Sequence, residues 1–354
     1  MRSEYDERSP RTVFETGSLS RVSEEVERLN KKRIILVSDE SAKNWAEQVK
    51  EQLGELVVQH IDHVVMHVPD EFSAPIVDQS KKLEIDLVIS IGGGSATGLG
   101  KILALDVGAD LLAIPTTYAG SEMTTIWGRT RNGEKLTGRN QSVMPKTVIY
   151  DPALTYSLPL NISANSGMNA IAHAVEAMYA TNCTPEVARA SLEGIEIFSK
   201  SLRTLVKDSS SNQVRSDLFR GSMLCGYALN NATMGIHHKI CHTLGGFYNL
   251  PHAQMHSAVL PHAVHFNQSY ASTQLDVIAS ALSAKSAAEG LWQLACDIGS
   301  ETALKNIGYN IENSDHVAEF ISTAKYENPR PFNYEGIVGL LKNAFNGDRP
   351  HDES

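Results

Sequence analysis

The sequence predicts an α/β domain with a parallel sheet, followed by a domain built almost entirely of helices. Two observations predict this fold class. Up to about residue 155, short apolar runs alternate with amphipathic stretches of helical period, the rhythm of strand–helix–strand units with right-handed crossovers. From Ser163 onward the helical period dominates. A length of 354 residues exceeds the usual size of one hydrophobic core, so two domains are expected.

The predicted strands of the first domain are apolar runs without alternation, which is typical of strands buried on both faces of a sheet. The strands are expected at Arg33–Ser38, His63–Val68, Asp86–Ile91 and Leu111–Pro115. The helices between them are expected at Ala42–Leu53, Ser73–Glu84 and Gly92–Asp106. The stretch Arg129–Arg139 predicts an exposed hairpin.

Helical spacing covers most of the second domain. The predicted helices are Asn165–Ala180, Thr184–Thr204, Val214–Gly235, His237–Gly246, Gln274–Leu282 and Ala287–Ile298. Pro152 and Pro159 punctuate the chain before the first of these helices. We therefore place the boundary near Asp151–Pro159, with domains of residues 1–155 and 156–354.

Composition and charge exclude several classes of protein. Hydrophobic residues make up 42% and charged residues 20%, which is ordinary globular composition. The net charge of −10 argues against binding to nucleic acid or to anionic membranes. The four cysteines are far apart in sequence, and the charged start MRSEYDERSPR lacks the apolar run of a signal peptide. No apolar run approaches the length of a membrane span, so we expect a cytoplasmic location.

A glycine-rich turn is the first candidate binding site. Gly93, Gly94 and Ser95 lie between the expected strand ending at Ile91 and a helix. Such a turn lets backbone N–H groups and a helix N-terminus approach a phosphate. The spacing matches neither the usual dinucleotide fingerprint nor the Walker motif. By themselves, the glycines fit a tight structural turn equally well.

Two neighbouring strand ends strengthen the case for a nucleotide site. Thr116 and Thr117 follow one predicted strand, with Ser121 shortly after, and Asp39 follows another. Ligands of open parallel sheets bind beyond the carboxyl ends of the strands. An acidic residue such as Asp39 can accept hydrogen bonds from a ribose 2′-hydroxyl and would repel a 2′-phosphate. An ordinary helix N-cap is an equally good interpretation of Asp39.

Histidines gather in the second domain. His238 and His242 are four residues apart on one predicted helix, and His252 follows Pro251. Asn169 and His173 show the same spacing on an earlier helix. The pattern fits a Zn²⁺ or Fe²⁺ site, or a metal-free site in which histidine acts as acid, base or hydrogen-bond donor. The neutral amide of Asn169 is a weaker metal ligand than Asp.

Four segments together resemble one known family. GGGS, IPTTYAGSE, SGMNAIAHAVEA and HHKICHTLGGFYNLPHA are similar, in order and spacing, to segments of the iron-containing alcohol dehydrogenase superfamily, and the resemblance runs from about Thr12 to Arg349. It implies a dehydroquinate synthase-like fold: a Rossmann-like NAD(P)-binding domain, a helical catalytic domain and an active site in the cleft between them. It also implies a homodimer. The metal ligands it implies are Asn169, His173, His238 and His252.

Within this superfamily the chain resembles the maleylacetate reductase branch. The telling segments are GSATGL, TYAGSE, GMN and NPRP. Alcohol dehydrogenases of the superfamily typically carry Asp where this chain has Gly98 and Asn169. The resemblance therefore favours a metal-independent enzyme. It implies NADH- or NADPH-dependent reduction of the maleylacetate double bond to 3-oxoadipate, in the degradation of aromatic compounds.

The implied reaction assigns roles to the histidines. Hydride adds to the alkene carbon β to the ketone, charge builds on the ketone oxygen as an enolate, and the α-carbon is protonated. The donor candidates are His173, His238, His242 and His252, and His242 is our choice because its counterpart in the family lies near the nicotinamide. Asn169 and Tyr118 are candidates for contact with substrate. The two carboxylates of the substrate need cationic or strong donor groups, and the candidates are Lys101, Arg129, Arg131, Arg330 and backbone N–H groups.

Three alternatives remain at the level of sequence. The first is a metal-dependent alcohol or polyol dehydrogenase of the same superfamily that tolerates Asn169. The second is a nucleotide-binding module without turnover, which is disfavoured because all four histidines are present. The third is a sugar-phosphate cyclase, which would need an intact metal site and more basic residues. Asp39 favours NADH over NADPH.

Overall fold

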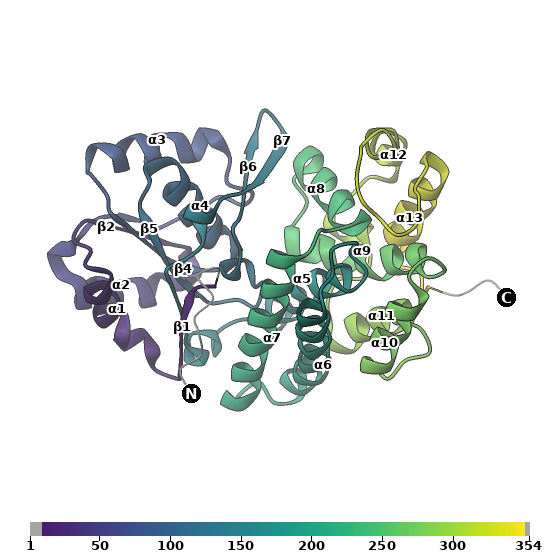
Figure 1. The fold of residues 1–354 in the computed structure, drawn as a ribbon, viewed down its shortest axis with the longest axis horizontal. Coiled ribbons are helices and arrows are strands. Elements are labelled where there is room, and N and C mark those ends of the chain that lie inside the picture. Colours follow the sequence, from purple (N-terminus) through teal and green to yellow (C-terminus); the bar gives the residue numbers. More distant parts are fainter. Residues whose placement is uncertain (1–8, 351–354) are drawn as a thin grey trace. The chain divides into compact units, whose positions relative to one another are not determined.

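The structure, a computed structural model, describes residues 9–350, so residues 1–8 of the charged start lie outside the described residues. The described residues form two compact units, which divide between Leu158 and Pro159 (Figure 1). The first combines a parallel sheet with helices and the second is helical, which confirms the predicted fold class. The binding and catalytic roles assigned to the two domains stay predictions.

Six parallel strands form the sheet of the first unit, in the order β1-β8-β5-β4-β2-β3. Their bounds are β1 (Arg11–Phe14), β2 (Ile34–Ser38), β3 (Val57–Ile61), β4 (Leu87–Gly92), β5 (Asp110–Pro115) and β8 (Thr147–Tyr150). The predictions for β2, β4 and β5 are confirmed to within a residue or so. The short strands β1 and β8 were not predicted individually.

Residues of β2 explain why its sequence shows no alternation. Ile34 and Leu36 belong to an apolar core shared with α1 (Val22–Leu29) and α2 (Lys43–Leu53). Ile35 and Val37 belong to another, shared with α3 (Asp70–Lys82) and α4 (Gly94–Val107). Every position of the strand is therefore buried, as expected for a central parallel strand with helices on both faces.

The prediction of a strand at His63–Val68 is wrong. The neighbouring strand is β3 at Val57–Ile61, an edge strand that pairs only with β2 in the described sheet. His67 and Val68 have φ of 64° and 46°, in the left-handed region, which ends any extended run there. The segment is apolar because Val68 is buried against the core beneath α3 and α4, where it acts as a packed connection.

The predicted hairpin at Arg129–Arg139 is confirmed, with an earlier start, but the prediction that it is exposed is wrong for most of its residues, which are partly buried. It consists of β6 (Ile126–Arg131) and β7 (Glu134–Arg139), which pair antiparallel around the turn Asn132–Gly133. Both turn residues have positive φ, as the tightest hairpin turns require.

Nine helices form the described part of the second unit. They are α5 (Leu160–Met178), α6 (Pro185–Lys207), α7 (Asn212–Asn231), α8 (Ile236–Tyr248), α9 (His252–Asn267), α10 (Ser272–Ala281), α11 (Ala287–Ile298), α12 (Ser314–Ser322) and α13 (Tyr334–Asn346). Helix α5 is the central one: every residue from Ser163 to Met178 is buried, and the helix packs against α6, α7 and α9.

Six of these helices were predicted from their apolar period, and α11 matches to the residue. Helices α9, α12 and α13 were not predicted. In α9, Pro261 lies inside the helix and histidines take buried positions, so neither propensity nor an apolar stripe indicated it.

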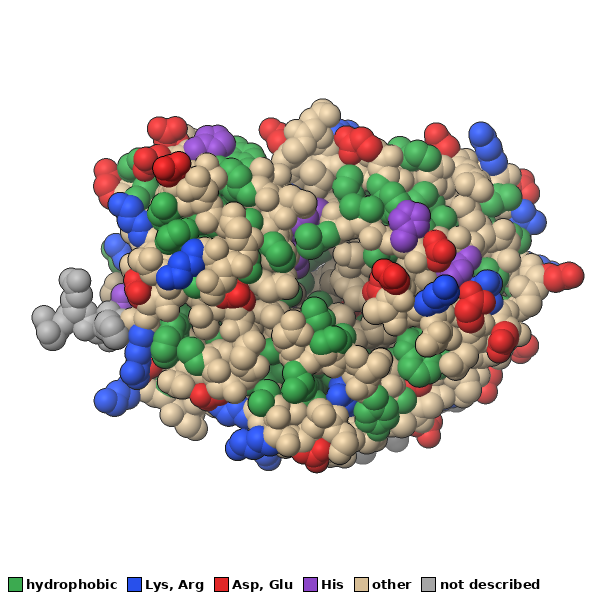
Figure 2. Space-filling model, turned by 180° about the vertical axis from the view of Figure 1, so that it is seen from behind, with side chains coloured by type: hydrophobic (Ala, Val, Ile, Leu, Met, Phe, Trp, Pro, Cys, Tyr) green, Lys and Arg blue, Asp and Glu red, His purple; other side chains and the backbone are tan. Residues whose placement is uncertain are grey.

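The surface carries charges of both signs. On the face drawn in Figure 2, acidic and basic side chains are interspersed with apolar ones. Within the described residues, no helix combines the length and the apolar character needed to cross a membrane.

Replacing Gly92 should destabilise the first unit. Gly92 has a φ of +147°, and an added Cβ would overlap the Asp39 carboxylate. We expect Gly92→Ala to cost about 3 kcal/mol of unfolding free energy, from backbone strain and overpacking combined. The matched control is Gly94→Ala, two residues along, where a Cβ meets nothing within 4 Å. Thermal denaturation midpoints that are equal for the two variants would contradict this expectation.

Candidate active site

The carboxyl ends of β2, β4 and β5 are neighbours in the sheet and carry the predicted cofactor-binding residues. The Gly93 N–H donates to Asp39 Oδ2 at 2.8 Å. The Thr117 side chain lies against Gly93, where its Cγ2 would be 3.2 Å from an added Cβ. The Thr116 N–H bonds the Gly92 carbonyl at 3.0 Å. The structure therefore brings residues from three strand ends into one cluster.

The side chain of Asp39 acts as an N-cap in the structure, as one of its two interpretations predicted. Its Oδ1 accepts from the Ala42 N–H at 3.0 Å and from the Ser41 hydroxyl at 2.6 Å, at the start of a 3₁₀ turn. Its Oδ2 bonds Gly93, which links the end of β2 to the glycine turn. The capping role is thus observed. A bond to ribose stays a prediction.

The N-terminus of α4 has the features of an anion site. No side chain caps it, and its first turn contains no acidic residue. The Cβ position of Gly94 faces open space, and Ser95 follows on the same turn. Because the first N–H groups of a helix lack partners within the helix, they can bind a phosphate there. These residues fit the pyrophosphate of a dinucleotide, although Asp39 already occupies the Gly93 N–H.

Lys101 holds the segment that contains Ser121. Its buried Nζ donates to the carbonyl oxygens of Ser121 at 2.6 Å, Thr124 at 2.7 Å and Ile126 at 2.8 Å. Burial lowers the pKa of Lys101 to about 7, while the nearby Glu122 opposes the shift. Lys101 therefore anchors the loop after β5 to α4, and its donors are already engaged. Tyr118, in the same loop, is fully buried.

The arginines that were candidates for binding the substrate carboxylates also have partners within the protein. Arg129 forms an ion pair with Asp106 of α4 at 2.8 Å, and Arg131 forms one with Asp70 of α3. Both attach the hairpin to these helices. Arg330 donates to the Phe266 carbonyl at 3.1 Å and lies 4.2 Å from the centroid of the Phe266 ring. The structure gives each of these arginines a structural partner.

Three helices of the second unit supply the predicted catalytic residues. Asn169 and His173 lie on α5, His238 and His242 on α8, and His252 begins α9. The ring centroid of His238 is 5.1 Å from that of His173 and 6.0 Å from that of His242. The structure therefore places His173, His238 and His242 in one cluster, as the spacing predicted.

Two further histidines belong to this cluster. The centroid of His256 on α9 is 4.4 Å from that of His252 and 5.1 Å from that of His238. His237 Nε2 and His256 Nδ1 are 2.9 Å apart, a hydrogen bond within the core. Neither residue is assigned a role from the sequence. His256 connects His252 with the rest of the cluster.

Burial keeps the inner rings of this cluster uncharged. Desolvation, followed by the neighbouring His238, holds the pKa of His173 well below its usual value. Desolvation is also the main cause of the strongly lowered pKa values of His237 and His256. At neutral pH these three rings act through hydrogen bonds and not as cations.

Glu176 on α5 contacts the histidine cluster, and our sequence analysis gave it no role. Oε2 of its fully buried carboxyl group lies 2.6 Å from Nδ1 of His238, within hydrogen-bond distance. The carboxyl group also accepts from the backbone N–H groups of Gly235 at 2.9 Å, His237 at 3.0 Å and His238 at 3.2 Å. The carboxylate thus caps the N-terminus of α8. The available signal was its position, one helical turn after His173.

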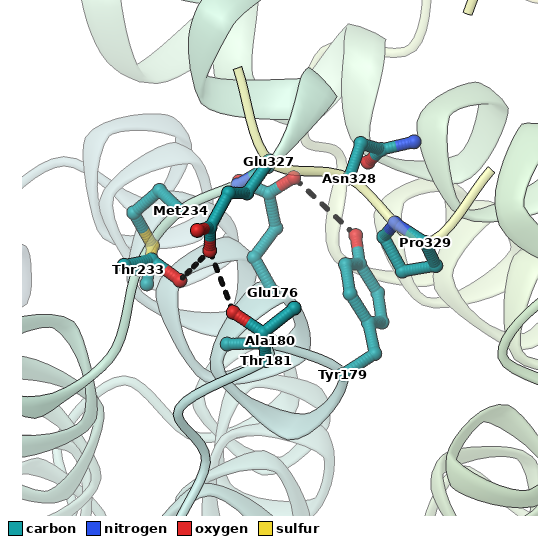
Figure 3. Close-up of a pocket in the computed structure, with 10 residues that line it drawn as sticks. Glu176, Tyr179, Ala180, Thr181, Thr233, Met234, Glu327, Asn328 and Pro329 are labelled. Atoms are coloured by element: carbon teal, nitrogen blue, oxygen red, sulfur yellow. Dashed lines mark hydrogen bonds between the residues drawn. The ribbon is translucent and has the colours of Figure 1, made fainter. Parts of the chain in front are cut away.

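A small pocket borders Glu176, lined also by residues of the segments around Thr233 and Glu327 (Figure 3). Tyr179 donates to the Glu176 carboxylate at 3.3 Å within it. The exposed Glu327 accepts from the Thr181 hydroxyl at 2.6 Å and from the Thr233 hydroxyl at 3.4 Å. The buried carboxylate therefore has a pocket beside it in addition to its contact with His238.

The metal set implied by the resemblance does not fit this geometry. Among the described residues, the one group of His, Cys, Asp or Glu with three ligand atoms within 4.8 Å of one another is His237, Cys241 and His256. In that group the closest nitrogens already share the 2.9 Å hydrogen bond. The implied set of His173, His238 and His252 does not meet that distance limit, and its fourth member is the neutral Asn169.

Comparisons with known proteins cover both units. The model of the iron-containing alcohol dehydrogenase family matches residues 9–152, and the model of the C-terminal part of the Fe-containing alcohol dehydrogenase family matches residues 163–345. Maleylacetate reductase 1 of Rhodococcus opacus is 43% identical over 340 residues, which are 96% of this chain and 95% of that protein.

Two further relatives are similarly close. Maleylacetate reductase of Burkholderia cepacia is 42% identical over 346 residues, 98% of each chain. The crystal structure of maleylacetate reductase from Agrobacterium tumefaciens matches with a TM-score of 0.90 and 38% identity, covering 97% of this chain and 98% of that one. With family models matching both of its units and relatives similar over nearly its whole length, the chain belongs to the iron-containing alcohol dehydrogenase family.

Proposed function

We propose that this protein is a maleylacetate reductase, which reduces the carbon–carbon double bond of maleylacetate to give 3-oxoadipate. The observation that carries the proposal is the identity of 42–43% with two maleylacetate reductases over at least 95% of each chain. The histidine cluster and the uncapped helix after the glycine turn supply the chemistry this reaction needs. At the level of fold alone, alcohol dehydrogenases would fit as well.

The cofactor we propose is NADH or NADPH, which supplies the hydride. The N-terminus of α4 at Gly94 and Ser95 would bind the pyrophosphate, and Gly93, Thr116, Thr117 and Ser121 would surround it. Asp39 favours NADH, because its carboxylate would repel a 2′-phosphate. Its bond to Gly93 keeps this carboxylate at the end of β2.

The histidine cluster would handle the charge that hydride transfer creates. Hydride reaching the alkene carbon β to the ketone turns the ketone oxygen into an enolate oxygen, which hydrogen-bond donors stabilise. The uncharged His173 can donate such a bond. His242 would protonate the α-carbon, completing the reduction with one hydride and one proton. Asn169 and Tyr118 are the proposed substrate contacts.

We derive no step through a metal ion. The three implied histidines do not form a group whose ligand nitrogens all lie within 4.8 Å of one another, and the neutral amide of Asn169 stands where a carboxylate would bind a divalent cation more strongly. Donors from the histidine cluster can stabilise the enolate without a Lewis acid. The finer proposals that accompany this function are a homodimer, a cytoplasmic location and a place in the degradation of aromatic compounds.

The first test follows NADH absorbance with maleylacetate as substrate. We expect NADH oxidation that dialysis against EDTA does not reduce, with metal content well below one ion per chain. Simple alcohols with NAD⁺ are the parallel assay. Absence of turnover with maleylacetate, together with metal-dependent oxidation of alcohols, would overturn the proposal in favour of a metal-dependent alcohol or polyol dehydrogenase.

Gly94→Ala should weaken NADH binding without weakening the fold. The added methyl group points into open space that the pyrophosphate would occupy, so we expect the KM for NADH to rise about tenfold with the melting midpoint unchanged. Gly339→Ala, on α13, is the matched control, since its Cβ also meets nothing within 4 Å. An unchanged KM in Gly94→Ala would place the cofactor elsewhere.

His242→Asn should lower kcat about 100-fold or more, because it removes the proposed proton donor. The KM for NADH should stay near that of the parent chain. His316→Asn, on the exposed surface of α12, is the control for loss of a histidine as such. A His242→Asn variant with parental kcat would transfer the role to another member of the cluster.

A further inference from the structure

Every contact that the structure gives the Glu176 carboxylate comes from a hydrogen-bond donor or from a ring nitrogen that can be one. Three are backbone N–H groups at the start of α8, one is the Tyr179 hydroxyl, and the fifth is Nδ1 of His238. Only Nδ1 of His238 or the Tyr179 hydroxyl oxygen could accept a hydrogen from a protonated carboxyl, whereas the three backbone N–H groups can only donate. The partial positive charge of the helix N-terminus adds to the preference for an anion. The set of partners therefore favours an ionised carboxylate.

An ionised carboxylate at 2.6 Å fixes which nitrogen of His238 carries the hydrogen. Because Glu176 Oε2 can only accept, Nδ1 must donate. In the neutral ring the other nitrogen, Nε2, then carries a lone pair. Nε2 of His238 is buried and has no hydrogen-bond partner among the described residues. An unpartnered buried acceptor is costly, which indicates that a ligand satisfies it in the working enzyme.

We propose that Glu176 is a positioning residue that holds neutral His238 in the Nδ1–H tautomer and presents its Nε2 as a hydrogen-bond acceptor to the active site. The proposal deepens the proposed function and rests on it for the identity of the substrate. It also changes one assignment of the sequence analysis. Neutral His238 cannot donate to the ketone oxygen from Nε2, so that role falls to other members of the cluster.

The acceptor at Nε2 has a defined use in this reaction. Each turnover consumes one proton from solvent, and a water molecule bonded to Nε2 would be oriented with its oxygen available to a second donor. His173 and His256 lie nearest to His238, with ring centroids 5.1 Å from it in both cases. The polar group that Nε2 binds is therefore one that carries a hydrogen, such as a water or a hydroxyl.

The direct test reads the tautomer by NMR of ¹⁵N-histidine-labelled protein without substrate, with His238→Asn used for assignment. We expect the His238 signals of the parent chain to show a protonated Nδ1 and a bare Nε2. A protonated Nε2, with Nδ1 either bare or also protonated, would overturn the proposal. The readout needs no turnover, so a failure in the maleylacetate assay would refute the proposed function and leave this result intact.

Two substitutions separate positioning from charge. Glu176→Ala removes the acceptor, so we expect His238 to populate both tautomers and kcat to fall about 10- to 100-fold. Glu176→Gln can turn its amide oxygen toward His238, so we expect it to keep the Nδ1–H tautomer and to recover part of the lost kcat. An unchanged tautomer in Glu176→Ala, or a Gln variant no better than Ala in both tautomer and kcat, would overturn the proposal.

Tyr179→Phe is the matched control. It removes a neighbouring donor to the same carboxylate and leaves the contact with His238 in place. We expect its His238 spectrum to equal that of the parent chain, and a changed tautomer would count against the proposal. If Glu176→Ala fails to fold, the spectra of the parent chain and of Glu176→Gln decide the question.

Discussion

The second unit depends on a buried carboxylate. Glu176 lies on α5 with its carboxylate fully buried. A carboxylate in such a place is tolerated only when several hydrogen-bond donors compensate its burial. The donors come mainly from the first turn of α8, so the charge that stabilises this helix start also fixes its position against α5. The histidines of α8 take their places relative to His173 because this one bond network holds the two helices together.

Several imidazole rings of the histidine cluster have centroids about 5 Å apart. Such packing is compatible with folding only because the rings are neutral. Burial lowers the pKa values of His173, His237 and His256 and removes the repulsion that charged rings would suffer. In the proposed reaction the cluster would therefore act on the anionic substrate through the direction of individual hydrogen bonds. The tautomer of each ring then matters more than the number of histidines.

Sequence patterns predicted the strands and helices that follow from the order of apolar residues within the segment itself. Strand β2 and helix α11 follow from an apolar run and an apolar period. Strand β3 was misplaced because an edge strand tolerates polar residues such as Gln59 and His60, while the more apolar segment after it is a packed connection. The histidine set was visible in its spacing. The contact of Glu176 with this set could not be predicted, because its partner His238 is 62 positions away in sequence, at the start of another helix.

The double engagement of Asp39 has a consequence for redesign of cofactor preference. A common way to admit a 2′-phosphate is to replace the acidic residue at this strand end with a small or basic one. In this chain the same carboxylate also bonds the Gly93 amide and caps the turn before α2. Removing it would release the glycine turn while changing the charge, so at the proposed cofactor site a change of selectivity would also change the turn geometry. A useful redesign would keep Asp39 and introduce the cation from a neighbouring strand.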